Sequence, residues 1–393
     1  MDIFSDDIRR NPYPLYDRLR AGSPLLRVPP PFNAWMVFDY ETVKRVLNDH
    51  ETFSSRVPAP KNWFIFFDPP RHSKLRGLIS QAFTPRTIAN LEEAIREISR
   101  GLLDRASGRG EMDLAAEYAV PLPMTVIARL IGMADADLDR YRHWSEAILR
   151  LSYSRSGGEE AEAALRDFTA VSAEMNEYLT GVMADRRGRP KDDLLTRLIE
   201  AEVDGERLSQ EEILGFFQLL VVAGQETTSD LINNAVLSLA ENAEQLALLR
   251  RSPELLPAAI EEVLRYRSPL QWMMRTPRRD VELHAQTVPA GAFLLAVIGA
   301  ANRDPKQFAA PHRFEIARDP NAHLAFGHGI HFCLGAALSR LEAKIALGDL
   351  LARFQHFELA GGEGWQPRKA LHVHGPQSLP IRFQIARGAG GRG

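Results

Sequence analysis

Cys333 is the only cysteine in a chain of 393 residues, and it lies in the segment FGHGIHFCLG, residues 326 to 335. A single thiol cannot form an internal disulfide, as is typical of proteins in a reducing compartment. Such a lone cysteine is commonly a small, buried apolar residue. Here, however, the neighbouring glycines allow the backbone to approach a large group, and residues 334 to 346 are predicted to form a helix that begins just after the sulfur.

That position favours two kinds of chemistry for the thiol. The N-terminus of a helix lowers the pKa of a cysteine, so we expect Cys333 to be a thiolate. A thiolate can act as a nucleophile beside a histidine, here His328 or His331, or as a soft ligand for iron. Zinc is disfavoured, because no second cysteine is available to share the ion.

A second polar group interrupts the most apolar stretch of the chain. Residues 209 to 242 are predicted to form one long central helix, which begins with a capping-box pattern at Ser209 and Glu212. AGQETT, residues 223 to 228, places Glu226 and Thr227 in the middle of it. An adjacent carboxyl and hydroxyl can relay protons in a dry site, whereas the alternative is a local kink with the hydroxyl bonded to a carbonyl.

The elements that must position these groups are mainly helices. Residues 88 to 106, for example, carry apolar side chains every three or four positions. Strands are predicted only in short segments, at 34 to 38 and within 281 to 297, where Pro289, Ala290 and Gly291 indicate a turn. Proline-rich residues 28 to 32 and 56 to 62 are expected to be loops.

Composition excludes several classes of protein. The net charge of −3 gives no basic excess for nucleic-acid binding. The N-terminus lacks the pattern of a signal peptide, and the apolar run 213 to 224 is too short to span a bilayer. We therefore expect a soluble, cytoplasmic protein without membrane contact, with one catalytic domain over residues 1–386 and a disordered tail over 387–393.

The cysteine segment resembles the haem-binding loop of the cytochrome P-450 superfamily, Phe-x-x-Gly-x-x-x-Cys-x-Gly, at Phe326, Gly329, Cys333 and Gly335. AGQETT is similar to the oxygen-binding segment of that family, and EEVLRY, residues 261 to 266, to its Glu-x-x-Arg helix. These motifs follow the family's order over nearly the whole chain. The resemblance implies a mainly α fold with small β-sheets, in which haem lies between the long central helix and the helix after the cysteine.

The resemblance also implies which residues hold the cofactor, haem b (iron protoporphyrin IX). Cys333 is the expected axial ligand of the iron. The other expected haem contacts are His72, Arg76, Ala223, Gly224, Arg275, Phe326, Gly327, His331 and Gly335. The histidines and arginines in this set suit the two haem propionates. A pair such as Glu262 and Arg265 contributes only ~0.2 to 0.5 kcal/mol on a surface, but the resemblance implies a buried structural network with Arg313 as its third member.

The implied activity is that of a haem-thiolate monooxygenase, which activates O2 and hydroxylates or otherwise oxidises a small organic molecule. Glu226 and Thr227 are its expected catalytic residues. Electrons would come from a separate ferredoxin or flavodoxin with its NAD(P)H-dependent reductase. The candidate docking charges for an acidic donor are Arg71, Lys74, Arg340 and Lys344. A peroxygenase driven by hydrogen peroxide, a haem-thiolate sensor without turnover and, more remotely, a cysteine hydrolase are the alternatives.

Apolar and aromatic residues dominate the segments that align with the family's substrate-facing regions, 62 to 67, 216 to 224, 270 to 274 and 374 to 378. The candidate pocket residues are Phe64, Phe66, Leu220, Trp272, Met273 and Met274. They predict a hydrophobic substrate, such as a terpenoid, steroid, fatty or aromatic molecule. The same side chains are equally typical of core packing.

Overall fold

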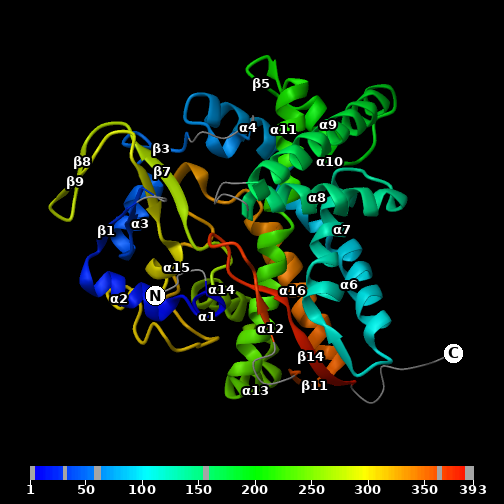
Figure 1. Cartoon of the computed structure of the whole chain (residues 1–393). Helices are drawn as coiled ribbons and strands as arrows, with labels where there is room; N and C mark the ends of the chain where they lie inside the picture. The colour runs from blue at the N-terminus through cyan, green and yellow to red at the C-terminus, as the bar shows by residue number, and fades with distance from the viewer. Residues whose placement is uncertain (1–4, 30–32, 57–62, 154–158, 361–364, 386–393) are drawn as a thin grey trace. The chain divides into compact units, whose positions relative to one another are not determined.

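The computed structural model of the chain describes residues 5–29, 33–56, 63–153, 159–360 and 365–385 (Figure 1). The expected tail and most of the loop at 56 to 62 lie outside these residues, as do residues 30 to 32. The chain divides into two compact units. Unit 1 comprises Met1–Val57, Ser99–Ala119 and Thr227–Gly393, and unit 2 comprises Pro58–Ile98 and Val120–Glu226.

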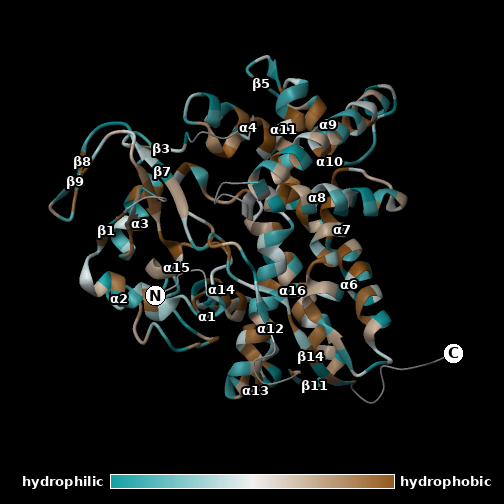
Figure 2. Cartoon of the chain, in the orientation of Figure 1, coloured by the Kyte–Doolittle hydropathy of each residue, from teal (hydrophilic) through white to brown (hydrophobic). Residues whose placement is uncertain are grey.

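Unit 2 is built mainly from helices. Its elements are η1 (Phe64–Phe66), α4 (Arg71–Ala82), α5 (Pro85–Ala89), α7 (Pro121–Leu130), η3 (Asp135–Asp137), α8 (Leu138–Tyr153), α9 (Glu159–Gly188), α10 (Leu194–Glu200), β5 (Glu202–Val203), β6 (Glu206–Arg207) and α11 (Gln210–Ala223). Helix α8 packs against α9 and α11, and the rings of buried Trp144 and Tyr178 meet edge to face at 5.4 Å. Brown and teal residues share single ribbons here, as expected of amphipathic helices (Figure 2).

Unit 1 contains the larger sheets. The first has the strand order β1 (Leu25–Val28), β2 (Ala34–Val37), β10 (Phe293–Ala296), β7 (Met273–Pro277) and β3 (Phe53–Ser54). The second has the order β11 (Phe354–Leu359), β14 (Pro380–Ile385) and β4 (Glu111–Asp113). Two-stranded ladders join β12 (Gln366–Pro367) to β13 (Pro376–Ser378) and β8 (Val281–Leu283) to β9 (Gln286–Val288).

Helices of unit 1 cover and connect these sheets. They are α1 (Asp6–Arg10), α2 (Tyr13–Gly22), α3 (Tyr40–Asn48), η2 (Ala115–Ala119), α13 (Ala243–Arg251), η4 (Pro253–Leu255), α14 (Leu256–Tyr266), α15 (Ile298–Ala301), η5 (Gly329–His331) and α16 (Ala336–Arg353). One core cluster joins the first sheet to α3 through fully buried Val37, Val43 and Leu294. Helix α3 is capped by Asp39, whose carboxylate accepts the Thr42 N–H at 3.0 Å.

The prediction of one continuous central helix over residues 209 to 242 is wrong, because the structure has two helices there. The capping box at Ser209 and Glu212 is present, but α11 ends at Ala223 and α12 (Glu226–Glu241) begins three residues later. Gly224 ends α11, and a Cβ there would lie 2.8 Å from Ile127 of α7 and 2.9 Å from the Leu220 carbonyl oxygen. The close packing of α7 explains why glycine stands at this position.

Two smaller boundaries also differ from the sequence-based expectation. The helix predicted over 88 to 106 is interrupted after α5, and α6 (Glu92–Ala106) is a separate helix. The predicted turn at 289 to 291 does precede β10, but His284 and Ala285 form an additional tight turn between β8 and β9. Both have positive φ, 48° and 57°, a conformation for which glycine or asparagine is the usual signal. Among the described residues, no helix combines the length and apolar character needed to cross a membrane.

Candidate functional site

Cys333 lies on a tight loop just before α16, in unit 1. Its N–H donates to the Phe326 carbonyl at 2.8 Å, and Gly335 is the N-cap residue of the helix. Cys333 is exposed, and the neighbouring Phe332 is 42% exposed. Helix α16 begins two residues later than predicted and runs on to Arg353. The thiol is therefore presented at a helix N-terminus, as the spacing predicted.

The loop depends on one glycine for its approach to α3. Gly329 has a φ of 72°, in the left-handed region, and a Cβ there would lie 2.9 Å from the Asn48 Cα. Backbone atoms cannot move aside as a flexible side chain would, so a larger residue would displace the loop. His331, two residues on, holds its Nε2 at 2.9 Å from the Ser55 hydroxyl.

The available donors fit a haem iron. A haem iron needs only one axial ligand from the protein. Cys333 provides an exposed thiol in a turn held by backbone hydrogen bonds. Within the described part of the chain, no three His, Cys, Asp or Glu side chains gather in a way that could hold a metal ion. A lone sulfur ligand thus matches a thiolate-bound haem better than a centre with several protein ligands.

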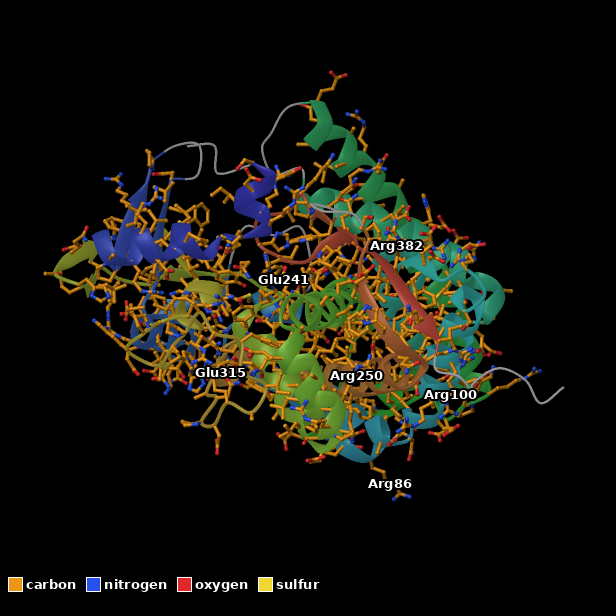
Figure 3. All side chains as sticks on the ribbon, turned by 90° about the horizontal axis from the view of Figure 1, so that it is seen from below. Arg86, Arg100, Glu241, Arg250, Glu315 and Arg382 are labelled. Atoms are coloured by element: carbon orange, nitrogen blue, oxygen red, sulfur yellow. The ribbon has the colours of Figure 1, made fainter. Side chains whose placement is uncertain are left out.

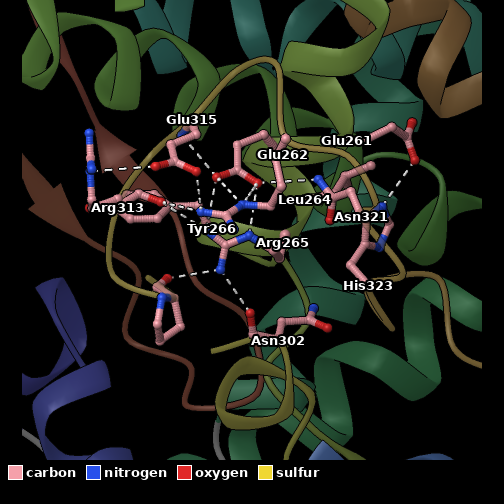
Figure 4. A network of polar contacts seen from close by, with 12 residues as sticks. Glu261, Glu262, Leu264, Arg265, Tyr266, Asn302, Arg313, Glu315, Asn321 and His323 are labelled. Carbon is pink, nitrogen blue, oxygen red and sulfur yellow. Dashed lines mark hydrogen bonds and ion pairs between the residues drawn. The ribbon is translucent and has the colours of Figure 1, made fainter. Parts of the chain in front are cut away.

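Unit 1 also contains a buried ion pair between Glu262 and Arg265 of α14 (Figure 4). The two carboxylate oxygens of Glu262 each accept a hydrogen bond of 2.8 Å from Arg265, and both side chains are 0% exposed. Arg265 also donates to the carbonyl oxygens of Asn302, Pro311 and Arg313. The pair therefore ties α14 to the segment that leads toward Cys333.

The expected role of Arg313 needs correction. Its side chain is 72% exposed and contacts Glu315 at 3.4 Å, so only its carbonyl oxygen joins the network. The third charged side chain is Arg318, 7% exposed, whose Nε lies 3.2 Å from both Glu262 oxygens. Asn321 donates to the same carboxylate at 3.2 Å. Sequence motifs missed Arg318, because no fixed spacing relates it to Glu262.

A second cluster, missed by the motifs, links α14 to α16. Glu261 accepts two hydrogen bonds from Arg340, at 2.7 and 2.8 Å, and its Oε2 lies 3.0 Å from His323 Nε2. Burial raises the pKa of Glu261, but the hydrogen bonds from Arg340 and His323 outweigh it and lower that pKa to about 2. Arg340 also lies over the Phe326 ring at 4.5 Å. This cluster fixes the first turns of α16 against the cysteine loop.

The four side chains expected to hold the propionates divide between the units. Arg275 of β7 is 3% exposed and donates to the Met274 carbonyl at 2.9 Å; it lies in unit 1 with His331. His72 and Arg76 lie in unit 2, one turn apart on α4. The His72 ring is buried and stacks on Phe64, with 6.0 Å between the ring centroids.

Glu226 and Thr227 stand on either side of the boundary between the two units along the chain. Glu226 is 4% exposed and begins α12, and Thr227 follows it as the first residue of the third segment of unit 1. Thr228 donates to the Ser339 hydroxyl of α16 at 3.1 Å, which fastens this end of α12 within unit 1. Gln225 accepts a hydrogen bond of 2.6 Å from Ser145 in unit 2. Ala223 is exposed, and Gly224 is half-buried.

The candidate pocket residues have mixed environments. Trp272 packs against the cluster of Tyr13, Tyr16 and Phe38, and Met273 packs against the core of the first sheet. These two contacts match the alternative of core packing. In unit 2, Phe64 is 5% exposed and contacts Phe216 at 6.0 Å between ring centroids. Phe66, Leu220 and Met274 are half-buried, as are Trp272 and Met273.

Comparison with known proteins gives consistent matches. A family model described as cytochrome P450 matches residues 159–375. The chain is 39% identical to cytochrome P450 monooxygenase PikC of Streptomyces venezuelae, covering 100% of this chain and 96% of that protein. The structure resembles cytochrome P450 CYP109Q5 from Chondromyces apiculatus, with a TM-score of 0.90, 38% identity and 98% of each chain covered. It also resembles CYP109E1 from Bacillus megaterium in complex with testosterone, with a TM-score of 0.88, 35% identity, 95% of this chain and 100% of that chain.

Proposed function

The chain belongs to the cytochrome P450 family, and on that premise we propose that Cys333 binds the iron of haem b in a monooxygenase for a hydrophobic small molecule. The protein is an oxidoreductase with a haem-thiolate cofactor, and it hydroxylates small organic compounds. When bound, the haem supplies the activation of O2. The fold is helix-rich with small sheets, like the P450 structures it resembles.

One observation carries the assignment of the ligand: the lone cysteine is exposed at the start of α16 on a loop held by Phe326 and Gly329. Arg340 lies on the same side of this loop. Its hydrogen bonds to Glu261 raise the pKa of its guanidinium, and the charge of Cys333 raises it further. Because the attraction is mutual, Arg340 stabilises the thiolate form that an iron ligand requires.

Glu226 and Thr227 handle protons in this proposal. Reduction of O2 consumes protons, and the carboxyl and hydroxyl are adjacent on α12 beside the interruption at residues 224 and 225. The low exposure of Glu226 keeps the carboxyl from bulk water. The Thr227 hydroxyl positions the proton that is delivered to O2, and the Glu226 carboxyl replaces that proton on Thr227.

The remaining predicted contacts bind and orient the cofactor. His72, Arg76, Arg275 and His331 pair with the two haem carboxylates, since arginine and histidine donors suit carboxylate oxygens. Ala223, Gly224, Phe326, Gly327 and Gly335 lie against the ring. We assign residues 1–386 to a single catalytic domain, because the family motifs follow one another over nearly the whole chain.

Bacterial members of the family receive electrons from redox partners, and we assign a ferredoxin or flavodoxin with its NAD(P)H-dependent reductase to this chain. Of the four candidate docking cations, Arg340 pairs with Glu261, Arg71 with Glu212 at 3.7 Å, and Lys74 with Glu206. Lys344 of α16 is exposed. An acidic donor would therefore depend more on Lys344 than on the other three.

A steroid-like or similarly apolar substrate suits the candidate pocket. Phe64, Phe66, Leu220 and Met274 supply aromatic and aliphatic surface, and the related CYP109E1 structure holds testosterone. Binding of an apolar substrate displaces water from this surface, which is the main favourable term for such ligands.

The absorption spectrum of the reduced protein under carbon monoxide tests the proposal. A thiolate opposite carbon monoxide gives a strongly red-shifted Soret band, which we expect for the wild type and not for Cys333→His. A variant at an exposed position, Arg382→Gln, should retain the shift. A wild-type protein that binds haem without the shifted band would overturn Cys333 as the thiolate ligand.

Thr227→Ala should uncouple electron consumption from product formation. Without the hydroxyl, proton delivery loses its positioning, so the product formed per reduced nicotinamide should fall several-fold while substrate binding is retained. The matched control is Thr169→Ala, which removes an exposed hydroxyl of α9. Unchanged coupling in Thr227→Ala would remove Thr227 from the proton pathway.

A further inference from the structure

Unit 1 contains a cavity of about 520 Å³ that none of the predicted haem or substrate residues lines. This volume lies within the range of about 300 to 1,000 Å³ that small-molecule sites occupy. The lining comes from α1, α2, the ends of α12 and α14, and the segment after α15. Its principal side chains are Arg10, Tyr13, Tyr266, Arg267, Arg303 and Trp365.

Arg303 is a buried cation in this wall. It is 5% exposed, and its guanidinium carbon lies 3.8 Å from the ring centroid of Tyr13 and 3.7 Å from that of Tyr266. Its Nε and Nη2 both donate to the Tyr266 carbonyl oxygen, at 3.0 and 2.6 Å. Among the described residues, no carboxylate lies within ion-pair distance of Arg303.

Burial lowers the pKa of the Arg303 guanidinium, and the charges of Arg265 and Arg267 add to the effect, although the two tyrosines oppose it. A buried charge costs several kcal/mol unless a counter-charge or hydrogen bonds compensate it. Stacking on two aromatic faces offsets part of this cost, but it supplies no anion.

Arg267 adds a second cation with unused donors. Its Nη2 lies 2.6 Å from Glu241, while its Nε and Nη1 are buried and make no hydrogen bond. Glu241, labelled in Figure 3, ends α12. Two nitrogens of a charged guanidinium are therefore left without an acceptor beside the cavity in the described part of the chain.

The acidic residues of the lining are already engaged. Asp17 pairs with Arg20 at 2.6 Å and lies 3.3 Å from His312, and Glu241 pairs with Arg267. Arg10, a third arginine of the wall, contacts Asp7 at 3.4 Å. The cavity thus has more positive than negative charge, and none of its carboxylates serves Arg303.

We propose that this cavity binds a small organic anion, whose carboxylate or phosphate group lies against Arg267 and Arg303 and whose apolar part lies against Tyr266 and Trp365. Such a ligand supplies the missing acceptors and the missing counter-charge at once. It also contacts Tyr266, the residue next to Arg265 in α14. None of the candidate pocket residues lines this cavity.

Thermal unfolding and calorimetric titration of the haem-loaded protein, with benzoate and inorganic phosphate as probes, test this site at constant ionic strength. We expect at least one probe to raise the Tm by several degrees, because a ligand that binds only the folded state stabilises it. The haem spectrum should not change. A response to benzoate alone assigns a carboxylate with an apolar body, and a response to phosphate alone assigns a phosphate ester.

Three variants make the test specific to the cavity. Arg267→Gln should weaken probe binding at least tenfold, whereas Arg382→Gln, an exposed arginine of β14 labelled in Figure 3, should leave it unchanged. Glu241→Gln should tighten binding several-fold, because it removes the carboxylate that competes for Arg267. If Arg267→Gln does not fold, the affinity of Glu241→Gln for the probe tests whether the cavity binds an anion.

The proposal is overturned if neither probe shifts the Tm of the wild type. It is also overturned if Arg267→Gln binds as the wild type does, or if Glu241→Gln binds no more tightly. Benzoate binding that shifts the haem spectrum and survives in Arg267→Gln would place the ligand at the haem instead. None of these outcomes bears on the spectrum under carbon monoxide, so the haem assignment is tested separately.

Discussion

Arg265 and Arg303 are two buried arginines of unit 1 whose charges are stabilised in different ways. Arg265 donates to both oxygens of one carboxylate, that of Glu262, and to three carbonyl acceptors (Figure 4). Arg303 has one carbonyl acceptor and two tyrosine rings. The charge of Arg265 is compensated by groups of the chain itself, whereas Arg303 lies beside an open cavity.

The difference teaches what each region is for. A bidentate, fully buried pair fixes a single arrangement of the backbone, because breaking it leaves a charge without compensation. A cation held by aromatic faces keeps its charge while leaving room for an external anion. The network therefore ties α14 to the segments around Asn302, Arg318 and Asn321, and the cavity leaves room for a ligand.

The largest effect is expected for Glu262→Gln. Loss of the carboxylate leaves Arg265 and Arg318 buried without their common partner, which should lower the free energy of unfolding by about 3 to 5 kcal/mol. Urea unfolding of the haem-loaded protein measures this change. Glu315→Gln is the control, because its carboxylate is 35% exposed and its loss should cost less than about 1 kcal/mol. Equal effects would mean that the buried pair has no special role.

A smaller effect is expected for Arg303→Met. The variant loses stacking worth about 2 kcal/mol, but it also removes a buried charge for which the described residues supply no carboxylate partner. We therefore expect a loss of no more than about 2 kcal/mol in the same urea experiment. If Arg303→Met costs as much as Glu262→Gln, the two arginines have the same structural role and the comparison fails.

The smallest effect concerns pH and His374, whose ring meets Tyr13 edge to face at 5.7 Å. Burial lowers its pKa to about 3, with a further contribution from the charge of Arg267. The unfolded chain takes up a proton near pH 6.5, whereas the folded chain does not until about pH 3. The contribution of the neutral His374 ring to the free energy of unfolding is therefore fully present above pH 6.5 and is lost as the pH falls from 6.5 to 3. Between pH 6.5 and 5.5, the free energy of unfolding of His374→Asn should fall by about 1 kcal/mol less than that of the wild type.

The unfolding free energy measured at several pH values checks this prediction, and His356→Asn is a matched control because that side chain is 61% exposed. An unchanged slope in His374→Asn would mean that the ring is protonated in the folded protein. The positive potential near Arg267 would then be weaker than the geometry indicates.

Local signals in the sequence predicted much of the fold. Helical spacing, the capping box at Ser209 and the short apolar segment of β2 all depend on neighbours in the chain, and all three are confirmed. The interruption after Ala223 was not predictable, because apolar spacing continues across it and the contact with Ile127 comes from another helix. The turn at His284 and Ala285 lacks the glycine that would have marked it.

The sequence by itself determined the family, the mainly helical class and the position of Cys333 before a helix, because each rests on residue types at fixed spacing. The roles of the other motif residues in the haem site stay predictions. Only the tertiary structure decided that Arg318 rather than the Arg313 side chain completes the Glu262 network, and that Arg303 lies between two tyrosines with no carboxylate of the described segments beside it. The physical reason is that compensation of a buried charge depends on which distant segments pack around it, and no spacing along the chain records that.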